Sequence, residues 1–300
     1  MQEIYRENIP VENEIRKFLS DIKDLSYHEK IIENVIDFSK KIPEVEAVFI
    51  MGSLALNTAD IFSDIDFYVM IKRDTVLEEI KSIFLSNLKN IGRIIHIFQS
   101  NAYASNSIFY FKPYVKFDLV IDYYDKFCVN WRIAERGKLL YDKAGLGINA
   151  IKKARGINFD ISKYEIEIRN VAIELPSFCY NIAGYMVRGE YITSIDFVAW
   201  IRRLLMRISG FLLGIWDEGT RRAETRFPKE ILSYYHQCII HGLKDVWRCL
   251  DVLLRWFSEW MVPRFEMNGI EHAGDEIPLI RIMISRLKEK KGNEEIDHRD

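Results

Sequence analysis

The residues VEAVFIMGSLALNTADIFSDIDFYV, numbers 45–69 of 300, decide how the first half of the chain folds. They contain two apolar runs, Val48–Met51 and Ile65–Ile71, and their Val, Ile, Phe and Tyr content is typical of β-strands. Between the runs, residues 53–58 resemble a short helical turn. We therefore expect two neighbouring strands that are joined by such a turn.

Two acidic side chains, Asp64 and Asp66, stand where the second run begins. Because successive strand residues point to opposite faces, both project from one side and Ile65 projects from the other. Neighbouring carboxylates repel each other unless a cation lies between them, and their oxygens suit Mg²⁺, which also binds substrate phosphates. Gly52 and Ser53, directly after the first run, offer a phosphate an unobstructed backbone and a hydroxyl. The stretch predicts a Mg²⁺–nucleotide site.

A third acid follows in the strand-like run Tyr114–Ile121, where Lys116 and Asp118 share one face with Asp122, the residue directly after the run. If this strand lies beside the run that starts at residue 65, Asp118 points toward the first two acids. It can then take a proton from an attacking hydroxyl or bind a metal ion. The alternative is that Asp118 and Asp122 are ordinary acids near a strand end.

The first half alternates strand and helix patterns, which predicts an α/β (α+β) domain over residues 1–150. We expect a mixed sheet of about five strands with helices packed on it. The expected strands are Val48–Met51, Ile65–Ile71, Arg93–Gln99, Ile108–Lys112 and Tyr114–Ile121. The expected helices are Val11–Ile22, Tyr27–Ile42 and Thr75–Leu88.

The second half changes character, because apolar residues recur there at three- and four-residue spacing. This predicts an all-α helical-bundle domain over residues 151–291, followed by a charged, disordered tail at 292–300. The expected helices are Tyr164–Arg188, Ile192–Trp216, Ile231–Met261 and Pro278–Lys288.

Composition limits the classes of function. A formal net charge of −2 gives no electrostatic reason to bind nucleic acid, which makes such a partner unexpected. The four cysteines lack CxxC pairing, which favours a reducing cytoplasm, and the histidines lack zinc-site spacing. The most apolar long stretch, Phe197–Trp216, carries three arginines, so we expect no membrane span. Without a GxxxxGK[ST] motif, a P-loop NTPase is excluded.

The acidic motif resembles a known signature. Residues 51–53, a gap of ten and then residues 64–67 resemble the signature of the nucleotidyltransferase superfamily related to DNA polymerase β. The helical second half narrows the resemblance to antibiotic nucleotidyltransferases. VKFDLVID, residues 115–122, resembles the third-carboxylate strand of the aminoglycoside 6-adenylyltransferases. Residues 188–208 resemble both that group and the LinB-type lincosamide nucleotidyltransferases.

The resemblance implies a role for each matching residue. Gly52 and Ser53 would hold the β- and γ-phosphates of a nucleoside triphosphate, and Asp118 would be the general base. The implied reaction moves a nucleoside monophosphate, AMP by preference, from the triphosphate to a hydroxyl of a small molecule and releases pyrophosphate. An aminoglycoside or a lincosamide is the expected acceptor. Two Mg²⁺ ions are expected, and the candidate nucleotide or metal ligands are Gly52, Ser53, Ser63, Asp64, Asp66 and Asp118.

One departure from the family pattern concerns charge. Many members carry a basic residue shortly after the Gly-Ser pair, whereas residues 54–58 here are LALNT. Arg202 and Arg203 are candidates to meet the triphosphate charge, because a guanidinium suits a phosphate. The alternative is that both belong to a solvated or salt-bridged helix face, paired with Asp196 or Glu190.

Two other functions remain open. The first is a regulatory protein on the same fold, such as a toxin–antitoxin partner that acts on a protein or an RNA. The second is an RNA-end nucleotidyltransferase, which the near-neutral charge disfavours. The presence of all three acids, Asp64, Asp66 and Asp118, argues against a degenerate binding module.

Overall fold

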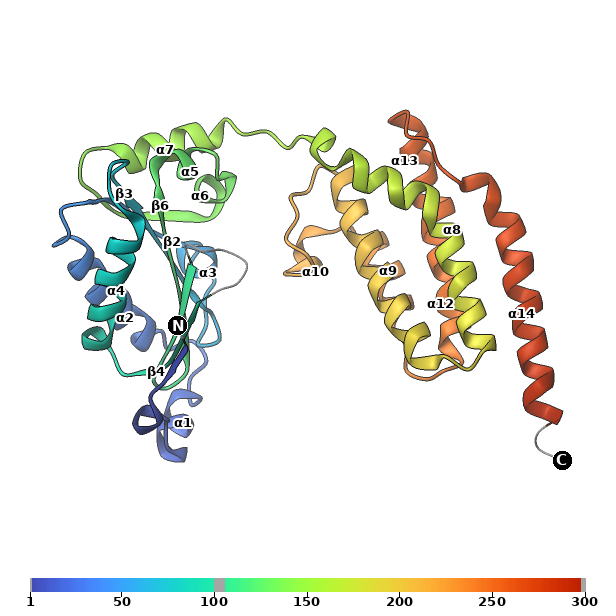
Figure 1. Cartoon of the computed structure of the whole chain (residues 1–300), viewed down its shortest axis with the longest axis horizontal. Helices are drawn as coiled ribbons and strands as arrows, with labels where there is room; N and C mark the ends of the chain where they lie inside the picture. Colours follow the sequence, from blue (N-terminus) through green and yellow to red (C-terminus); the bar gives the residue numbers. More distant parts are fainter. Residues whose placement is uncertain (1, 100–105, 298–300) are drawn as a thin grey trace. The chain divides into compact units, whose positions relative to one another are not determined.

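The computed structural model describes residues 2–99 and 106–297 (Figure 1). The chain divides into two compact units, Met1–Asn158 and Phe159–Asp300, which we call the first unit and the helical unit. Helix α7 (Leu146–Arg155) packs on strands of the first unit, so this division falls a few residues after the expected boundary at 150. Each unit is described by itself.

The first unit is built on a mixed seven-stranded sheet in the order β1-β4-β5-β6-β3-β2-β7. The β3–β6 pair is parallel and every other pair is antiparallel. The strands are β1 (Gln2–Ile4), β2 (Val45–Met51), β3 (Ile65–Ile71), β4 (Ile94–Gln99), β5 (Asn106–Phe111), β6 (Val115–Tyr123) and β7 (Gly137–Asp142).

All five expected strands are present, but the expected number was too low because both sheet edges were missed. Strand β1 has only three residues, too few to show a period-two pattern. Strand β7 reads GKLLYD and has no β-branched residue, so its sequence carries a weak strand signal.

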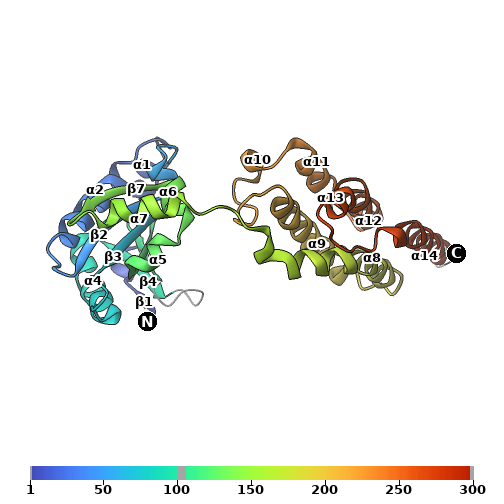
Figure 2. The same ribbon diagram turned by 90° about the horizontal axis from the view of Figure 1, so that it is seen from above.

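Helices cover the two faces of the sheet differently (Figure 2). Helices α2 (Ser26–Ser39) and α4 (Leu77–Ile91) pack on one face, where residues from β3, β5 and β6 form an apolar layer. Helices α5 (Tyr124–Cys128), α6 (Trp131–Arg136) and α7 pack on the other face, against a smaller cluster of β2 and β3 residues. On this second face, alternate residues of β5 and β6 stay half-buried. The remaining helices of the unit are α1 (Glu12–Phe18) and α3 (Gly52–Ala55).

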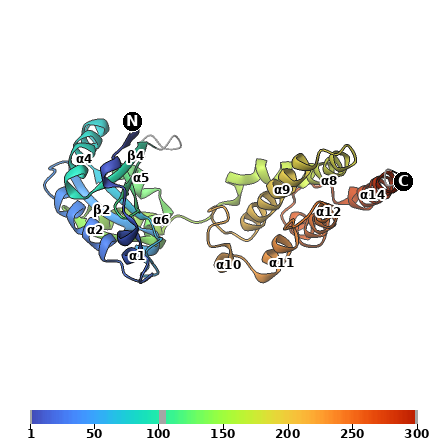
Figure 3. The same ribbon diagram turned by 90° about the horizontal axis from the view of Figure 1, so that it is seen from below.

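The helical unit is held by one apolar core, in which α8 (Glu165–Val187) contacts α9 (Tyr191–Leu212), α12 (Asp245–Arg255) and α14 (Ile277–Asp297) (Figure 3). Helix α8 is continuous across Pro176. The other helical segments are α10 (Ala223–Arg226), α11 (Lys229–Gln237), a π-helical turn (Trp256–Met261), α13 (Val262–Met267) and the 3₁₀ turns Ile161–Tyr164 and Gly274–Glu276. Within the described ranges, no helix is long and apolar enough to cross a membrane.

Two expectations for the helical unit need correction. The expected helix Ile231–Met261 is divided into α11 and α12 by a turn over residues 238–244. In this turn the carboxylate of Asp245, the first residue of α12, accepts hydrogen bonds from the backbone N–H groups of His241 and Gly242. The expected tail at 292–300 is helical as far as Asp297, since α14 continues through Lys and Glu residues that favour helix. Residues 298–300 lie outside the described residues.

Candidate functional site

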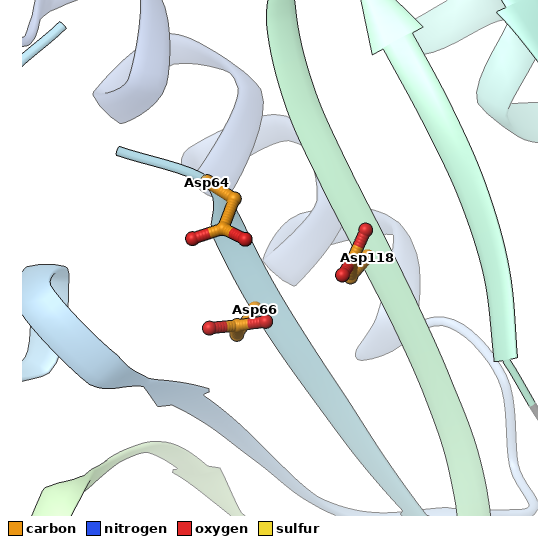
Figure 4. A group of neighbouring side chains, drawn as sticks. All are labelled: Asp64, Asp66 and Asp118. Carbon is orange, nitrogen blue, oxygen red and sulfur yellow. The ribbon is translucent and has the colours of Figure 1, made fainter. Parts of the chain in front are cut away.

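The structure brings three acids together on the face of the sheet against which α5, α6 and α7 pack. Asp64 directly precedes β3, Asp66 lies near its start, and Asp118 comes from the neighbouring strand β6 (Figure 4). Each offers a carboxylate oxygen, and these oxygens lie within 4.8 Å of one another. The side chains of Asp64 and Asp118 are 29% and 13% exposed, so the cluster is reachable from solvent but only partly hydrated.

Strand register explains why acids from distant segments converge. Asp66 pairs with Asp118 in the parallel β3–β6 ladder, and Ile65 pairs with Phe117. Because side chains alternate along each strand, the acids lie on one face while Phe67 and Phe117 lie on the other. There the two rings pack with centroids 5.4 Å apart in the apolar layer under α2 and α4. Burial of the aromatic pair therefore fixes the side on which the acids stand.

Gly52 places the backbone of α3 directly beside the acids. Its φ of +69° is left-handed, and a Cβ built there would lie 3.2 Å from Oδ2 of Asp66. Ser53, which follows, is almost fully buried. The chain thus turns from β2 into α3 with a Cα that carries no side chain and faces the carboxylate of Asp66.

Ser63, a predicted nucleotide contact, lies in the turn that leads into β3. Its hydroxyl accepts a hydrogen bond from the backbone N–H of Asp60 at 3.1 Å. Its carbonyl accepts one from Nε2 of His28 at 2.9 Å, and His28 is completely buried in α2. Burial lowers the pKa of His28, so this imidazole is neutral at neutral pH. His28 therefore anchors the backbone immediately before Asp64.

Lys116 is a member of the site to which we assigned no role from the sequence. Its Nζ lies 2.8 Å from Oδ2 of Asp118 and 3.1 Å from Oδ2 of Asp64. Burial opposes the charge of Lys116, but the hydrogen bond to Asp118 and the charges of Asp118 and Asp64 outweigh burial and raise its pKa. The signal was present in the sequence, because Lys116 stands two residues before Asp118 and so shares its face.

A cavity of about 450 Å³ opens beside the acids, along β3 and β6. Asp66 and Asp118 line it, and so does the loop between α5 and α6, which the sequence did not indicate. Asp122 also lines it and accepts a hydrogen bond from the backbone N–H of Tyr123 at 2.8 Å. The other lining residues are Tyr68, Val120, Lys126, Phe127, Val129, Asn130, Trp131 and Arg132.

The two arginines proposed for phosphate contact lie in the helical unit, on α9. Arg202 donates a hydrogen bond to the carbonyl of Cys238 at 3.1 Å and stacks on the ring of Tyr235 at 4.8 Å. Glu190, one of the alternative partners, instead pairs with Arg188 at 2.5 Å. Arg203 is exposed and lines a shallow hollow on α9. A phosphate contact by Arg203 stays a prediction.

The three carboxylates fit a divalent cation chemically. Mg²⁺ prefers oxygen ligands and completes its shell with water and substrate phosphate, which suits an acid cluster that solvent can reach. A cation bound by Asp64, Asp66 and Asp118 would polarise a phosphoryl oxygen and neutralise negative charge. The roles of the individual residues remain predictions.

Comparisons with known proteins found one family model and several solved structures. Residues 6–108, about a third of the chain, match the family described as "SidM, N-terminal domain". No curated protein matches the chain.

Several solved structures match over most of their length. An aminoglycoside 6-adenyltransferase from Bacillus subtilis is 14% identical, with a TM-score of 0.40, and the match covers 86% of this chain and 97% of that one. A nucleotidyltransferase-like protein from Exiguobacterium sibiricum is 12% identical, with a TM-score of 0.39 and coverage of 77% and 74%. Spectinomycin adenyltransferase AAD(9) from Enterococcus faecialis, solved with ATP and spectinomycin, is 15% identical, with a TM-score of 0.32 and coverage of 87% and 99%.

Proposed function

We propose that this protein is a metal-dependent nucleotidyltransferase that transfers a nucleoside monophosphate from a nucleoside triphosphate to a hydroxyl of a small molecule. The convergence of Asp64, Asp66 and Asp118 within 4.8 Å is the single observation that carries the proposal. The three carboxylates supply oxygen ligands for a divalent cation, and the cation in turn binds substrate phosphates. A Cβ built on Gly52 would lie 3.2 Å from Oδ2 of Asp66. Because glycine lacks this atom, a triphosphate can approach the backbone next to the acids, which supports the proposal.

The residues divide the work of an in-line displacement. Asp118 accepts the proton of the attacking hydroxyl while the hydroxyl oxygen bonds to the α-phosphorus and the bond to pyrophosphate breaks. Gly52 and Ser53 hold the leaving phosphates, and Ser63 lies on the loop that positions Asp64. Two positive centres are needed, one near the attacking oxygen and one near the leaving oxygen. From the sequence, both were expected to be Mg²⁺ ions.

The donor and acceptor follow from the family resemblance. ATP is the proposed donor, and an aminoglycoside or lincosamide hydroxyl is the proposed acceptor. The cavity beside Asp118 and Asp122 offers the acceptor a partly acidic wall on the side where the general base stands. The cytoplasm, which supplies ATP, is the proposed location and agrees with four free cysteines.

The test uses the purified full chain with Mg²⁺. Each of the four labelled nucleoside triphosphates is incubated with a panel of aminoglycosides, lincosamides and RNA oligonucleotides. We expect pyrophosphate release that depends on a small acceptor and that is lost in the Asp66→Asn variant. Label on RNA or on a protein would instead favour an RNA-end enzyme or a toxin–antitoxin partner. No nucleotide-dependent transfer with any acceptor would contradict the proposal.

A further inference from the structure

Lys116 brings a positive charge into the acid cluster from the same strand as Asp118. Its Nζ lies within hydrogen-bond distance of Oδ2 of both Asp118 and Asp64, at 2.8 and 3.1 Å. These two carboxylates belong to the group whose oxygens approach within 4.8 Å of one another. The ammonium therefore occupies the space between two candidate ligands of a metal ion.

The backbone keeps Lys116 in this position. Strand β6 alternates, so Val115 and Phe117 turn into the apolar layer under α2 and α4, where both are buried. Lys116 and Asp118 must then share the opposite face. The Lys116 side chain is only 27% exposed, so water hydrates its charge poorly and the two carboxylates compensate for that loss.

We propose that the ammonium of Lys116 supplies one of the two positive centres of the transfer site, so that the cluster holds a single divalent cation when nucleotide is bound. The inference rests on the proposed function and replaces the sequence-based expectation of two Mg²⁺ ions. The charge between Asp64 and Asp118 would come from the chain itself, and Asp66 with the phosphates would bind the remaining ion.

Electrostatics explains why a lysine at this position excludes a second ion. Like charges a few ångströms apart repel strongly in a poorly hydrated site, and the repulsion doubles when one of them is divalent. A second ion that binds both Asp64 and Asp118 would have to displace Nζ from both oxygens. Removal of the ammonium frees those oxygens and makes the cluster more negative, so a second ion can then bind.

The experiment counts metal ions and does not depend on turnover. Lys116→Met keeps a side chain of similar length and removes its charge. Lys112→Met is the matched control, because Lys112 is also mostly buried and pairs with Glu14 at 2.7 Å. Equilibrium dialysis with Mn²⁺ and a non-transferable α,β-methylene analogue of ATP measures ions and nucleotide per chain. We expect about one Mn²⁺ for the wild type and for Lys112→Met, and about two for Lys116→Met.

Other counts contradict the inference. Two ions in the wild type, or one ion in both the wild type and Lys116→Met, would show that Lys116 does not take the place of a cation. Nucleotidyl transfer by a wild type with two ions would leave the proposed function standing without the inference. If the wild type and all variants bind no Mn²⁺, both the inference about Lys116 and the proposed metal-dependent function are contradicted. Circular dichroism checks folding, and Lys116→Gln is the second variant if Lys116→Met unfolds.

Discussion

Asp66 and Asp118 are direct partners in the parallel β3–β6 ladder, although α4, β4 and β5 separate them in the chain. Parallel neighbours require a long crossover, so the two acids meet only when that whole crossover is in place. Their shared rung puts both carboxylates on the same face, with Asp64 one step before Asp66 on that face. The candidate site is therefore a property of the sheet register.

Substitution of Asp66 and substitution of Asp118 should lower activity for different reasons. We expect Asp66→Asn to abolish turnover because it removes a charged metal ligand, and Mn²⁺ binding should weaken with it. Asp118→Asn should lower the chemical step by about 10²–10⁴-fold, since an amide cannot accept the proton. Single-turnover kinetics and Mn²⁺ titration of each variant measure the two effects. Near-normal turnover in Asp66→Asn would refute the metal assignment.

Gly52→Ala tests the approach of α3 to the acids. The left-handed φ should cost about 1–2 kcal/mol of the free energy of unfolding, and the new Cβ would crowd Oδ2 of Asp66. Gly145→Ala is the control, because Gly145 has a φ of +79° but nothing lies within 4 Å of its built Cβ. We expect both variants to lose similar stability in urea unfolding and only Gly52→Ala to lose Mn²⁺ affinity. Equal Mn²⁺ affinity in the two variants would contradict this.

His28 should make stability depend on pH. Its pKa is lowered from about 6.5 by burial, so the unfolded state binds a proton that the folded state resists. Stability should therefore fall as pH decreases below about 6.5 toward the folded-state pKa. Among the described residues, Nδ1 of His28 has no hydrogen-bond partner, so a proton there would gain no hydrogen bond.

The corresponding measurement compares the wild type with His28→Gln in urea unfolding at pH 7.5 and pH 5. Glutamine has an amide donor for the Ser63 carbonyl but does not titrate. The difference in unfolding free energy between the two proteins should shrink as the pH is lowered. Parallel pH profiles would mean that His28 makes no such contribution.

Thiol reactivity should distinguish the four cysteines. Cys179, Cys238 and Cys249 are buried, and burial raises their pKa values, that of Cys238 to about 12. Cys128, on α5, is partly exposed. Because the thiolate is the reactive form, a chromogenic thiol reagent should label Cys128 in the folded protein and the others only after unfolding. Rapid native labelling of Cys128→Ser would contradict this burial pattern.

Period-two alternation was sufficient to predict the central strands and the acids on them. The runs Ile65–Ile71 and Tyr114–Ile121 are long and rich in β-branched and aromatic residues, so their faces could be read directly. Their adjacency could be stated only as a condition, because strand order depends on contacts between distant segments. The edge strands β1 and β7 were missed because β1 has only three residues and β7 has no β-branched residue.

The part of the site that the sequence did not indicate comes from tertiary placement. Lys116 was known to share a face with Asp118, but its pairing with Asp64 requires β6 to lie beside β3. The α5–α6 loop, residues 129–130, lines the cavity only because of its tertiary position, which the sequence pattern does not show. The division near Gly242 was hidden because apolar spacing continues through the break, and the hydrogen bonds from this turn to Asp245 cannot be read from the spacing.

The aromatic pair Phe67–Phe117, on the far side of the sheet from the acids, has a consequence for natural variation. A substitution that replaces either ring with a smaller side chain would loosen the alignment of β3 and β6. The positions of the carboxylates would then change, although no atom that contacts a nucleotide has been altered. Lineages of this protein should therefore tolerate change there only in compensating pairs, and an inactive descendant can arise with every acid still in its sequence.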